Sequence, residues 1–368
     1  MTKINLLITV GILAIAILLI SGIAGCAPAG TIKVGVLTPL TGPAAFYGND
    51  ILKGIEIAKD SINEKGGING ASIELVIEDS KCDGQTAITA ANKLSDIDKV
   101  VGIVGEACSA AAMTLSPIAK DKNFVLIAAA ASNPALTDNP YVFRVNPNDF
   151  AQAQIIAEYL AEKGVKNVSI LALNDEYGQG LVGEFTKQFT GLNGEIKQTE
   201  WFDSQATDFK TQIAKLDSSK FEMLFIIAQP AQHPLIAKQL LELGKNWSRI
   251  AEFNFGTVPS ESANSAMAGT LYPIIFFNDT ATENALILKQ KMQENYSSQP
   301  DIITAWGFDS LYVLAQAAEK CPKDSITASC INQNLIGLSF EGAAGKNRIT
   351  DKGEIAQPPT QIVEYKAI

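Results

Sequence analysis

Histidine is almost absent from this sequence, and its scarcity excludes several kinds of site. The 368 residues include a single histidine, His233, between Gln232 and Pro234. One imidazole cannot build a histidine-rich metal centre, and a Ser-His-Asp triad would depend on this residue alone. We therefore expect His233 to be a polar surface or loop residue, no metal to be bound, and the protein not to be an enzyme.

Signature motifs of nucleotide and redox chemistry are also missing. The sequence contains no G-x-x-x-x-G-K-[ST] phosphate loop and no C-x-x-C pair. Residues 178–183 match G-x-G-x-x-G, but residues 174–177 separate them from the preceding apolar run. Two of those four residues are carboxylates, placed where a pyrophosphate would lie. We expect neither a dinucleotide nor any other cofactor.

Basic residues and long apolar runs are scarce as well. There are 29 Lys and Arg against 39 Asp and Glu, and the net charge is −10. This balance argues against nucleic acid as a partner, because such binding needs basic patches. One apolar run approaches the ~20 residues that span a bilayer. It covers residues 4–20, contains no charged residue and follows Lys3.

This N-terminal run is typical of an export signal. Residues 23–26 (IAGC) resemble the lipobox of prokaryotic lipoproteins, where the signal is cut before an acylated cysteine. We predict a signal peptide over residues 1–25, lipid on Cys26, and an anchor and tether over residues 26–31. An uncleaved membrane anchor is the alternative. In both cases we expect the rest of the chain at the outer face of the cytoplasmic membrane or in the periplasm.

The other four cysteines suit an oxidising compartment. With Cys26 lipidated, Cys82, Cys108, Cys321 and Cys330 form an even set that allows three pairings. Local spacing favours Cys82–Cys108 and Cys321–Cys330. Closing these loops would stabilise the protein by about 3.5 and about 2.6 kcal/mol in the chain-entropy account.

Short apolar runs alternate with helical patterns in two successive rounds. Strands are expected at residues 32–37, 73–77, 100–104 and 124–130, then at 167–173, 195–201, 223–228 and 249–253. Helices are expected at residues 49–63, 85–94, 110–120, 150–163, 180–189, 208–216 and 234–243, followed by 283–296 and 303–320. A last strand is expected within 360–366. This order predicts an α/β fold of two Rossmann-like lobes, each a parallel sheet flanked by helices.

Two loops in the first round are suited to a small ligand. Ser109 opens an expected helix directly after a strand, where its hydroxyl can bind a carboxylate. Residues 128–134 follow the next strand and offer backbone groups and the Ser132 hydroxyl. Ligands of open α/β sheets bind at such carboxyl ends of strands.

Three motifs elsewhere in the sequence point to one family. They are residues 41–48 (TGPAAFYG), 63–70 (NEKGGING) and 177–180 (YGQG). With them the chain resembles the leucine/isoleucine/valine-binding proteins of branched-chain amino-acid ABC transporters, which are type I periplasmic-binding proteins. The resemblance runs from about residue 32 to the C-terminus.

The resemblance implies a set of ligand contacts. Ser109 after Cys108 would bind the ligand carboxylate, with Ser132 in place of the family's threonine. The Ala130 carbonyl would meet the ammonium, and Tyr47 and Tyr177 would cover an aliphatic side chain. The half-cystine partner of Cys108 falls on Cys82.

Two positions depart from the family pattern or stay open. Gln229 stands where an aromatic is common, which implies a more polar or differently shaped pocket. The acid that meets the ammonium falls on Glu252, with Asn254 as the alternative.

The implied architecture is two lobes joined by about three crossing strands, which close on the ligand. Lobe 1 would comprise residues 32–148 and 276–358, and lobe 2 residues 149–275 and 359–368. The implied function is delivery of a small amino acid, branched-chain or other aliphatic, to ABC transporter permease subunits. A binder of a short amide or urea-like solute, or a ligand-sensing module, is the alternative.

Overall fold

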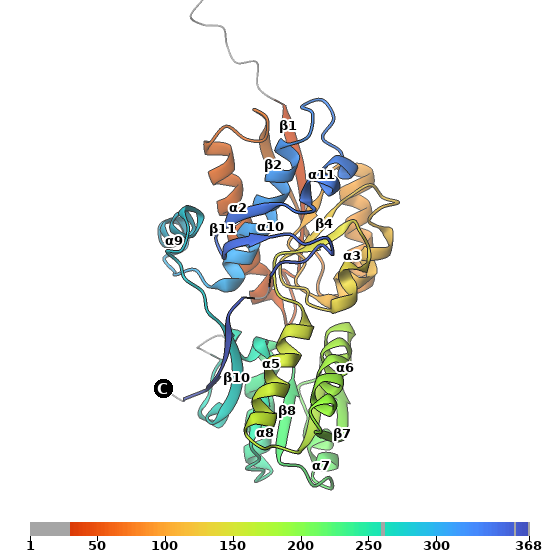
Figure 1. Ribbon diagram of the computed structural model, residues 1–368, viewed down its shortest axis with the longest axis vertical. Helices are drawn as coiled ribbons and strands as arrows, with labels where there is room; N and C mark the ends of the chain where they lie inside the picture. Colours follow the sequence, from red (N-terminus) through yellow and green to blue (C-terminus); the bar gives the residue numbers. More distant parts are fainter. Residues whose placement is uncertain (1–29, 259–261, 357, 367–368) are drawn as a thin grey trace, which may run out of the picture.

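The computed structural model describes residues 30–258, 262–356 and 358–366. The predicted signal peptide and the lipidation site at Cys26 lie outside the described residues. Figure 1 shows two α/β lobes stacked along the long axis of the molecule. In the described part of the chain, no helix combines the length and apolarity needed to cross a membrane.

The first lobe is built on a five-stranded parallel sheet. Its strand order is β2-β1-β3-β4-β5. The strands are β1 (Thr31–Thr38), β2 (Ser72–Asp79), β3 (Ile103–Val104), β4 (Leu126–Ala128) and β5 (Val142–Arg144). The helices that pack around it are α2 (Ala45–Glu64), α3 (Gly84–Asn92), α4 (Ser109–Leu115), α9 (Glu283–Tyr296), α10 (Ile302–Glu319) and α11 (Ala328–Leu335). The central strands are apolar because both faces of the sheet are covered.

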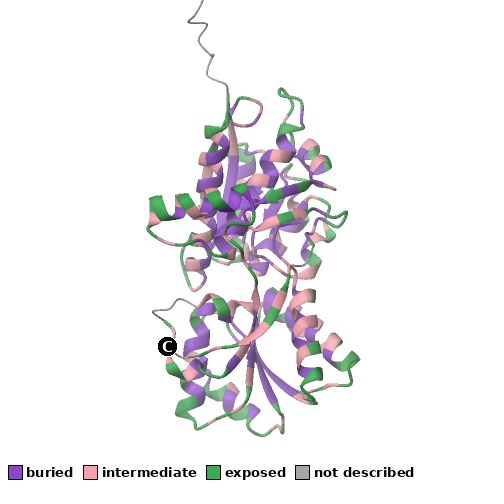
Figure 2. Cartoon of the chain, turned by 60° about the vertical axis from the view of Figure 1, so that its left-hand side comes forward, coloured by how far each residue is buried: buried purple, intermediate pink, exposed green. Residues whose placement is uncertain are grey.

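The second lobe carries a six-stranded sheet of order β13-β10-β9-β8-β6-β7. Its strands are β6 (Asn167–Leu173), β7 (Glu195–Phe202), β8 (Met223–Ile227), β9 (Arg249–Ala251), β10 (Thr270–Ile275) and β13 (Thr360–Glu364). Its helices are α5 (Asp149–Glu162), α6 (Glu176–Gly191), α7 (Lys210–Leu216) and α8 (His233–Glu242). The predicted two-lobed α/β fold is confirmed, and the second sheet is antiparallel at one edge, where β13 pairs with β10. Buried residues run along the strands of both lobes (Figure 2).

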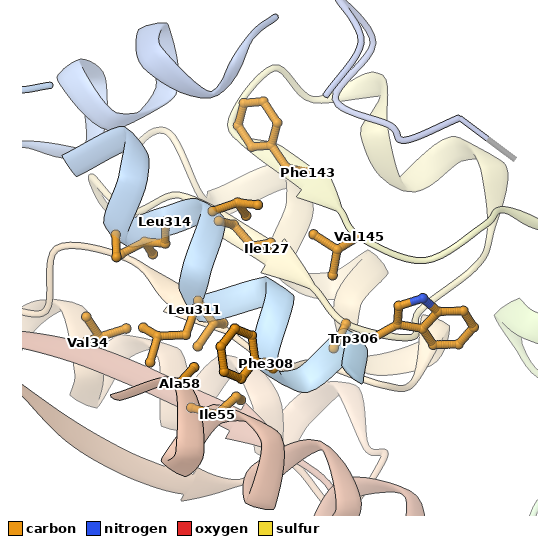
Figure 3. Packing of buried hydrophobic residues seen from close by; sticks show 14 of the residues in the cluster. Val34, Ile55, Ala58, Ile127, Phe143, Val145, Trp306, Phe308, Leu311 and Leu314 are labelled. Atoms are coloured by element: carbon orange, nitrogen blue, oxygen red, sulfur yellow. The ribbon is translucent and has the colours of Figure 1, made fainter. Parts of the chain in front are cut away.

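Helices α2 and α10 approach each other closely in the first lobe. A Cβ on Gly54 of α2 would lie 2.0 Å from the carbonyl oxygen of Thr304, and one on Gly307 would lie 2.2 Å from that of Ile51. The two glycines therefore let the helix backbones meet. Figure 3 shows Phe308 and Leu311 of α10 in the core cluster on this side of the lobe. Burial of each such side chain stabilises the fold by about 1.5–3 kcal/mol.

The chain passes between the lobes three times within the described residues. The passages follow β5, β10 and the hairpin β11 (Ser339–Gly342)–β12 (Gly345–Arg348). They occupy residues 145–148, 276–282, and 349–356 with 358–359. The sequence predicts about three crossings. Strand β5, helix α11 and this hairpin are additional to the elements expected from the sequence. The helix expected over 110–120 leaves α-geometry after Leu115, because Pro117 has no backbone N–H.

Both disulfides favoured by local spacing are present. Cys82 is bonded to Cys108 and Cys321 to Cys330, with Cα–Cα distances of 5.4 and 5.9 Å. The first bridge attaches the loop before α3 to the residue that precedes α4. It therefore anchors one of the two predicted ligand loops.

Candidate functional site

Two overlapping cavities lie between the lobes. The inner cavity borders the crossing segments at Asn148, Ile275 and Thr360. The outer cavity borders Ser109 and Gln229. Small-molecule sites are commonly found at such an interface between two lobes. Residues common to both cavities come from both lobes and are Tyr47, Ala130, Ser132, Tyr177 and Asn254.

Most of the predicted ligand contacts are brought together here. Ser109 is buried at the start of α4 and lines the outer cavity with Cys108. Its Oγ accepts hydrogen bonds from the backbone N–H groups of Ser132 (3.3 Å) and Asn133 (3.1 Å). Its hydroxyl hydrogen is then free to donate to a ligand. The predicted ligand contacts that line these cavities are Tyr47, Cys108, Ser109, Ala130, Ser132, Tyr177 and Gln229.

A buried glutamate ties the two ligand loops of the first lobe together. Glu106 Oε1 accepts the backbone N–H groups of Ala107 (3.0 Å) and Cys108 (2.9 Å). Its carbonyl oxygen accepts the N–H groups of Ala129 (3.2 Å) and Ala130 (3.3 Å). Burial raises the pKa of the Glu106 carboxyl to about 7, although these hydrogen bonds lower it. The sequence analysis missed this residue.

Glu252 lies behind the cavity wall. It is not among the residues that line either cavity, and it is fully buried. One carboxylate oxygen accepts a bond from the Tyr177 hydroxyl at 3.0 Å. The other is 2.7 Å from Nε2 of His233. The alternative residue, Asn254, does line both cavities, so the geometry favours Asn254 over Glu252 as a direct contact.

The expectation for His233 is wrong. Instead of lying on the surface or in a loop, it begins α8 and is 2 % exposed. Its ring contacts Phe255 edge to face, with 5.2 Å between ring centroids. The physical reason is its partner: Glu252, distant in sequence, supplies the acceptor that a buried imidazole needs.

Asp149 is the functional candidate that the sequence analysis missed. It begins α5 directly after the first crossing, is fully buried and lines the inner cavity. Neither of its carboxylate oxygens has a hydrogen-bond partner among the described residues. Oδ1 of Asn146, also in the inner cavity, is likewise buried without one. The available signal was an acid at the carboxyl end of a strand, just before a helix.

Burial raises the pKa of Asp149 to about 7, while the nearby Ser132 hydroxyl and Arg144 guanidinium lower it by less. A carboxylate in this setting is stabilised by any positive group that enters the cavity. Around it the wall is aromatic: Phe253 and Trp306 lie with ring centroids 5.7 Å apart. Figure 3 shows Trp306 directed away from Phe308 and Leu311 of the core.

Two glycines of the G-x-G-x-x-G match, Gly178 and Gly180, let neighbouring atoms approach α6 closely. Gly178 lies inside α6, where a Cβ would be 1.8 Å from the carbonyl oxygen of Leu173. A Cβ on Gly180 would be 2.7 Å from Nδ2 of Asn133 in the first lobe. That Nδ2 donates to the carbonyl oxygen of Glu176 at 2.7 Å, which forms a bond between the lobes. Asp175 caps α6 at Gly178 N (2.9 Å), so a carboxylate occupies the place of a phosphate.

The described part of the chain contains no cluster of metal-ligating side chains. No group of three or more His, Cys, Asp or Glu side chains there is arranged to hold an ion. The site instead combines hydroxyl donors, unpartnered acceptors and aromatic walls between two lobes. This arrangement suits reversible binding of a small polar molecule.

Comparison with known proteins agrees with this geometry. The leucine-, isoleucine-, valine-, threonine- and alanine-binding protein of Pseudomonas aeruginosa is 28% identical over 345 residues, which are 92% of this chain and 90% of that protein. The crystal structure of a leucine-binding protein from Thermotoga maritima has a TM-score of 0.82 and 27% identity, covering 91% of this chain and 95% of that one.

A third structure shares the fold with a different bound molecule. A solute-binding protein of an ABC transporter from Rhodopseudomonas palustris, in complex with 3,4-dihydroxybenzoic acid, has a TM-score of 0.80 and 21% identity, covering 92% of this chain and 94% of that one. The family model described as periplasmic binding protein matches residues 31–367. Two α/β lobes with cavities between them, and a family match along nearly all the described residues, make this chain a member of the periplasmic binding protein family, a solute binder and not an enzyme.

Proposed function

We propose that this protein binds a zwitterionic amino acid between its lobes and delivers it to the permease subunits of an ABC transporter. The observation that carries the proposal is a set of buried acceptor oxygens without partners in the inner cavity. They are both carboxylate oxygens of Asp149 and Oδ1 of Asn146. A cavity with this lining is complementary to a ligand rich in N–H donors.

An ammonium group meets that requirement. It carries three N–H donors and the positive charge that an isolated buried carboxylate lacks. A buried polar group without a partner costs about 1–3 kcal/mol, and a charged one costs more. An aromatic acid such as the 3,4-dihydroxybenzoic acid of the R. palustris complex offers phenolic O–H donors but carries no positive charge. It would bring a second negative charge into the cavity and leave the charge of an ionised Asp149 unmatched.

The carboxylate end of the ligand is assigned to the hydroxyls of Ser109 and Ser132. Both line the outer cavity, and Ser132 also lines the inner one, beside Asp149. We therefore move the proposed ammonium contact from Glu252 to Asp149, with Asn254 and the Ala130 carbonyl as neighbours.

The side chain of the ligand would extend past the rings of Tyr47 and Tyr177 toward Gln229. This end of the cavity is polar, since Asp175 also lines it and burial raises the pKa of that carboxyl to about 6. The proposal therefore favours an aliphatic side chain that is small or carries a polar end. Closure of the two lobes about the crossing segments would complete the site.

A neutral amide or urea-like solute is the second candidate. It also offers N–H donors, and a carboxyl with a pKa of about 7 is partly protonated near neutral pH. In that form Asp149 would match an uncharged ligand. The ionised form matches an ammonium.

Isothermal titration calorimetry separates these possibilities. The panel contains free amino acids, their amides, their deaminated acids, urea and 3,4-dihydroxybenzoate. We expect the free amino acids to bind most tightly, and Asp149→Asn to weaken that binding at least 100-fold. Asp309→Asn is the matched control, because Asp309 is equally buried, also has a pKa raised to about 7 by burial, and caps the β11–β12 turn away from the cavities. Normal binding by Asp149→Asn, or equal binding of a deaminated acid, would contradict the proposal.

A further inference from the structure

We infer that Glu252 is a positioning residue for the second-lobe wall of the cavity, and that it links the ligand site to the imidazole of His233. The inference rests on the proposed function for its binding readout only. Three side chains, Tyr177, Glu252 and His233, are hydrogen-bonded in series, and we call them the buried relay.

The carboxylate of Glu252 is fully occupied by donors. Oε1 accepts from His233 Nε2 at 2.7 Å and from the backbone N–H of Ala228 at 3.3 Å. Oε2 accepts from the Tyr177 hydroxyl at 3.0 Å and from the backbone N–H of Asn254. Glu252 itself is 0 % exposed. Four donors around a dry carboxylate define its position far more tightly than a surface contact would.

Two of these four donors belong to residues of the cavity wall, and a third directly precedes one. Tyr177 and Asn254 line both cavities, and Ala228 is followed directly by Gln229 of the outer cavity. The same carboxylate therefore orients the wall residues contributed by α6, by the end of β8 and by the turn after β9. Asn254 Nδ2 adds a bond to the Ala228 carbonyl at 3.3 Å, which joins two of these segments directly.

The relay also determines what Tyr177 can offer to a ligand. Burial and the nearby Glu252 carboxylate hold the pKa of the Tyr177 hydroxyl well above its usual value. The phenol therefore stays protonated and its proton is committed to Glu252. Its oxygen can only accept from a ligand, which selects for a hydrogen-bond donor at this position.

His233 is the far end of the relay and the reporter of its state. Its Nε2 must carry a proton to donate to Glu252 Oε1. A ligand that donates a hydrogen bond to the Tyr177 oxygen changes the electron density at Glu252. It thereby changes the hydrogen bond between Glu252 and the imidazole. Because this is the single histidine of the chain, its ring signals need no assignment.

The first test uses ligand-free protein. In ¹⁵N-histidine-labelled protein, long-range ¹H–¹⁵N spectra at a fixed pH are compared for the parent, Tyr177→Phe and Tyr47→Phe. Both substitutions remove one cavity hydroxyl and keep the ring, but only Tyr177 contacts Glu252. We expect Tyr177→Phe to shift the imidazole nitrogen resonances and Tyr47→Phe to leave them in place. Equal spectra for the parent and Tyr177→Phe would overturn the relay, whatever the ligand proves to be.

The second test uses L-leucine and L-alanine as probes. Glu252→Gln should weaken their binding about tenfold, and Tyr177→Phe by a similar factor. The double variant should be no weaker than the weaker single variant, because both act through one bond. Addition of either probe should also move the His233 signals in the parent protein and not in Tyr177→Phe. Multiplicative losses in the double variant would contradict the positioning role. Absence of binding by both probes to the parent would count against the proposed function, while the relay is still decided by the ligand-free spectra.

Discussion

The backbone N–H of Asp149 donates a hydrogen bond of 2.9 Å to the carbonyl oxygen of Ser132. Ser132 belongs to the first lobe, whereas Asp149 begins the first helix of the second. The residues proposed for opposite ends of the ligand are therefore joined by a bond at the first crossing. Motion of the lobes about this point would change the separation between these two residues little, so under the proposed assignment both ends of a zwitterion would be bound before closure.

The affinity for an amino acid should fall as pH falls below about 7. In the ligand-free protein, burial raises the pKa of Asp149 to about 7, and an ammonium binds the ionised carboxylate. Below this pKa a proton competes with the ligand, so the Kd should rise up to about tenfold per pH unit. Calorimetry at pH 5, 6, 7 and 8 measures it. A Kd that stays constant over this range would remove Asp149 from the site.

The ligand-free protein should be more stable at pH 5 than at pH 8. The pKa values of Asp149, Glu106 and Asp309 are raised by burial to about 7 in the folded state, above their values in the unfolded chain. A carboxyl whose pKa is higher in the folded protein than in the unfolded chain stabilises the folded state fully at pH values below its unfolded-state pKa. This contribution is lost as the pH rises through the folded-state pKa of about 7. Asp149→Asn should therefore stabilise the ligand-free protein at pH 8, by about 2 kcal/mol. Urea unfolding at both pH values tests this, and a destabilised variant at pH 8 would refute it.

The two disulfides should differ in their effect on binding. Replacing Cys82 and Cys108 by alanine should cost about 3.5 kcal/mol of stability and also weaken ligand binding, because Cys108 precedes Ser109 in the outer cavity. Replacing Cys321 and Cys330 should cost about 2.6 kcal/mol and leave the affinity unchanged. Denaturant unfolding and calorimetry on both pairs measure these effects. Equal affinity in the two double variants would show that the first bridge does not position Ser109.

Contact between the lobes should be sensitive to one glycine of α6 and insensitive to another. A methyl group on Gly180 would lie 2.7 Å from Asn133 Nδ2 and disturb the bond to Glu176, whereas nothing lies within 4 Å of the corresponding position on Gly183. Gly180→Ala should weaken ligand binding about tenfold. Gly183→Ala should keep the affinity and stabilise the helix by about 1 kcal/mol. Identical ligand affinities of Gly180→Ala and Gly183→Ala would show that the Asn133 contact does not contribute to lobe closure.

Cys26 stays a predicted lipidation site, and we expect the mature chain to begin there. Two or more acyl chains hold a protein firmly at a membrane, where a single chain is marginal. Cys26→Ser should release the protein or leave an unprocessed precursor. Mass spectrometry of the membrane-bound N-terminal peptide measures it, and an unmodified cysteine there would exclude the lipid.

Regular patterns in the sequence predicted the elements and the first-lobe half of the site. Strand β6 and helix α9 have the expected bounds, because each has one clear periodicity and clear ends. Ser109 and Ser132 follow strand ends and do meet in the cavities. Such positions can be predicted from the sequence because parallel strands place their carboxyl ends along one edge of the sheet.

The second-lobe half of the site was harder to predict, because it depends on contacts between distant segments. His233 can be buried because Glu252, on a different element, accepts a hydrogen bond from its ring. Asp149 is a candidate because its buried carboxylate oxygens have no hydrogen-bond partners among the described residues, and no local sequence pattern reveals that. The short strand β5 was missed because three residues carry almost no periodic signal.

The antiparallel pairing of β13 with β10 has a consequence for how the chain folds during synthesis. The second sheet receives its edge strand from residues 360–364, and the first lobe receives α10, which packs on α2, only after β6 to β10 of the second lobe have been made. Neither lobe can therefore complete its core from a nascent chain that lacks the C-terminal part. Both would remain partly open, with apolar strand faces exposed, until synthesis is nearly finished. Lobes that open and close as separate bodies in the mature protein would thus acquire their stability together, in one late step.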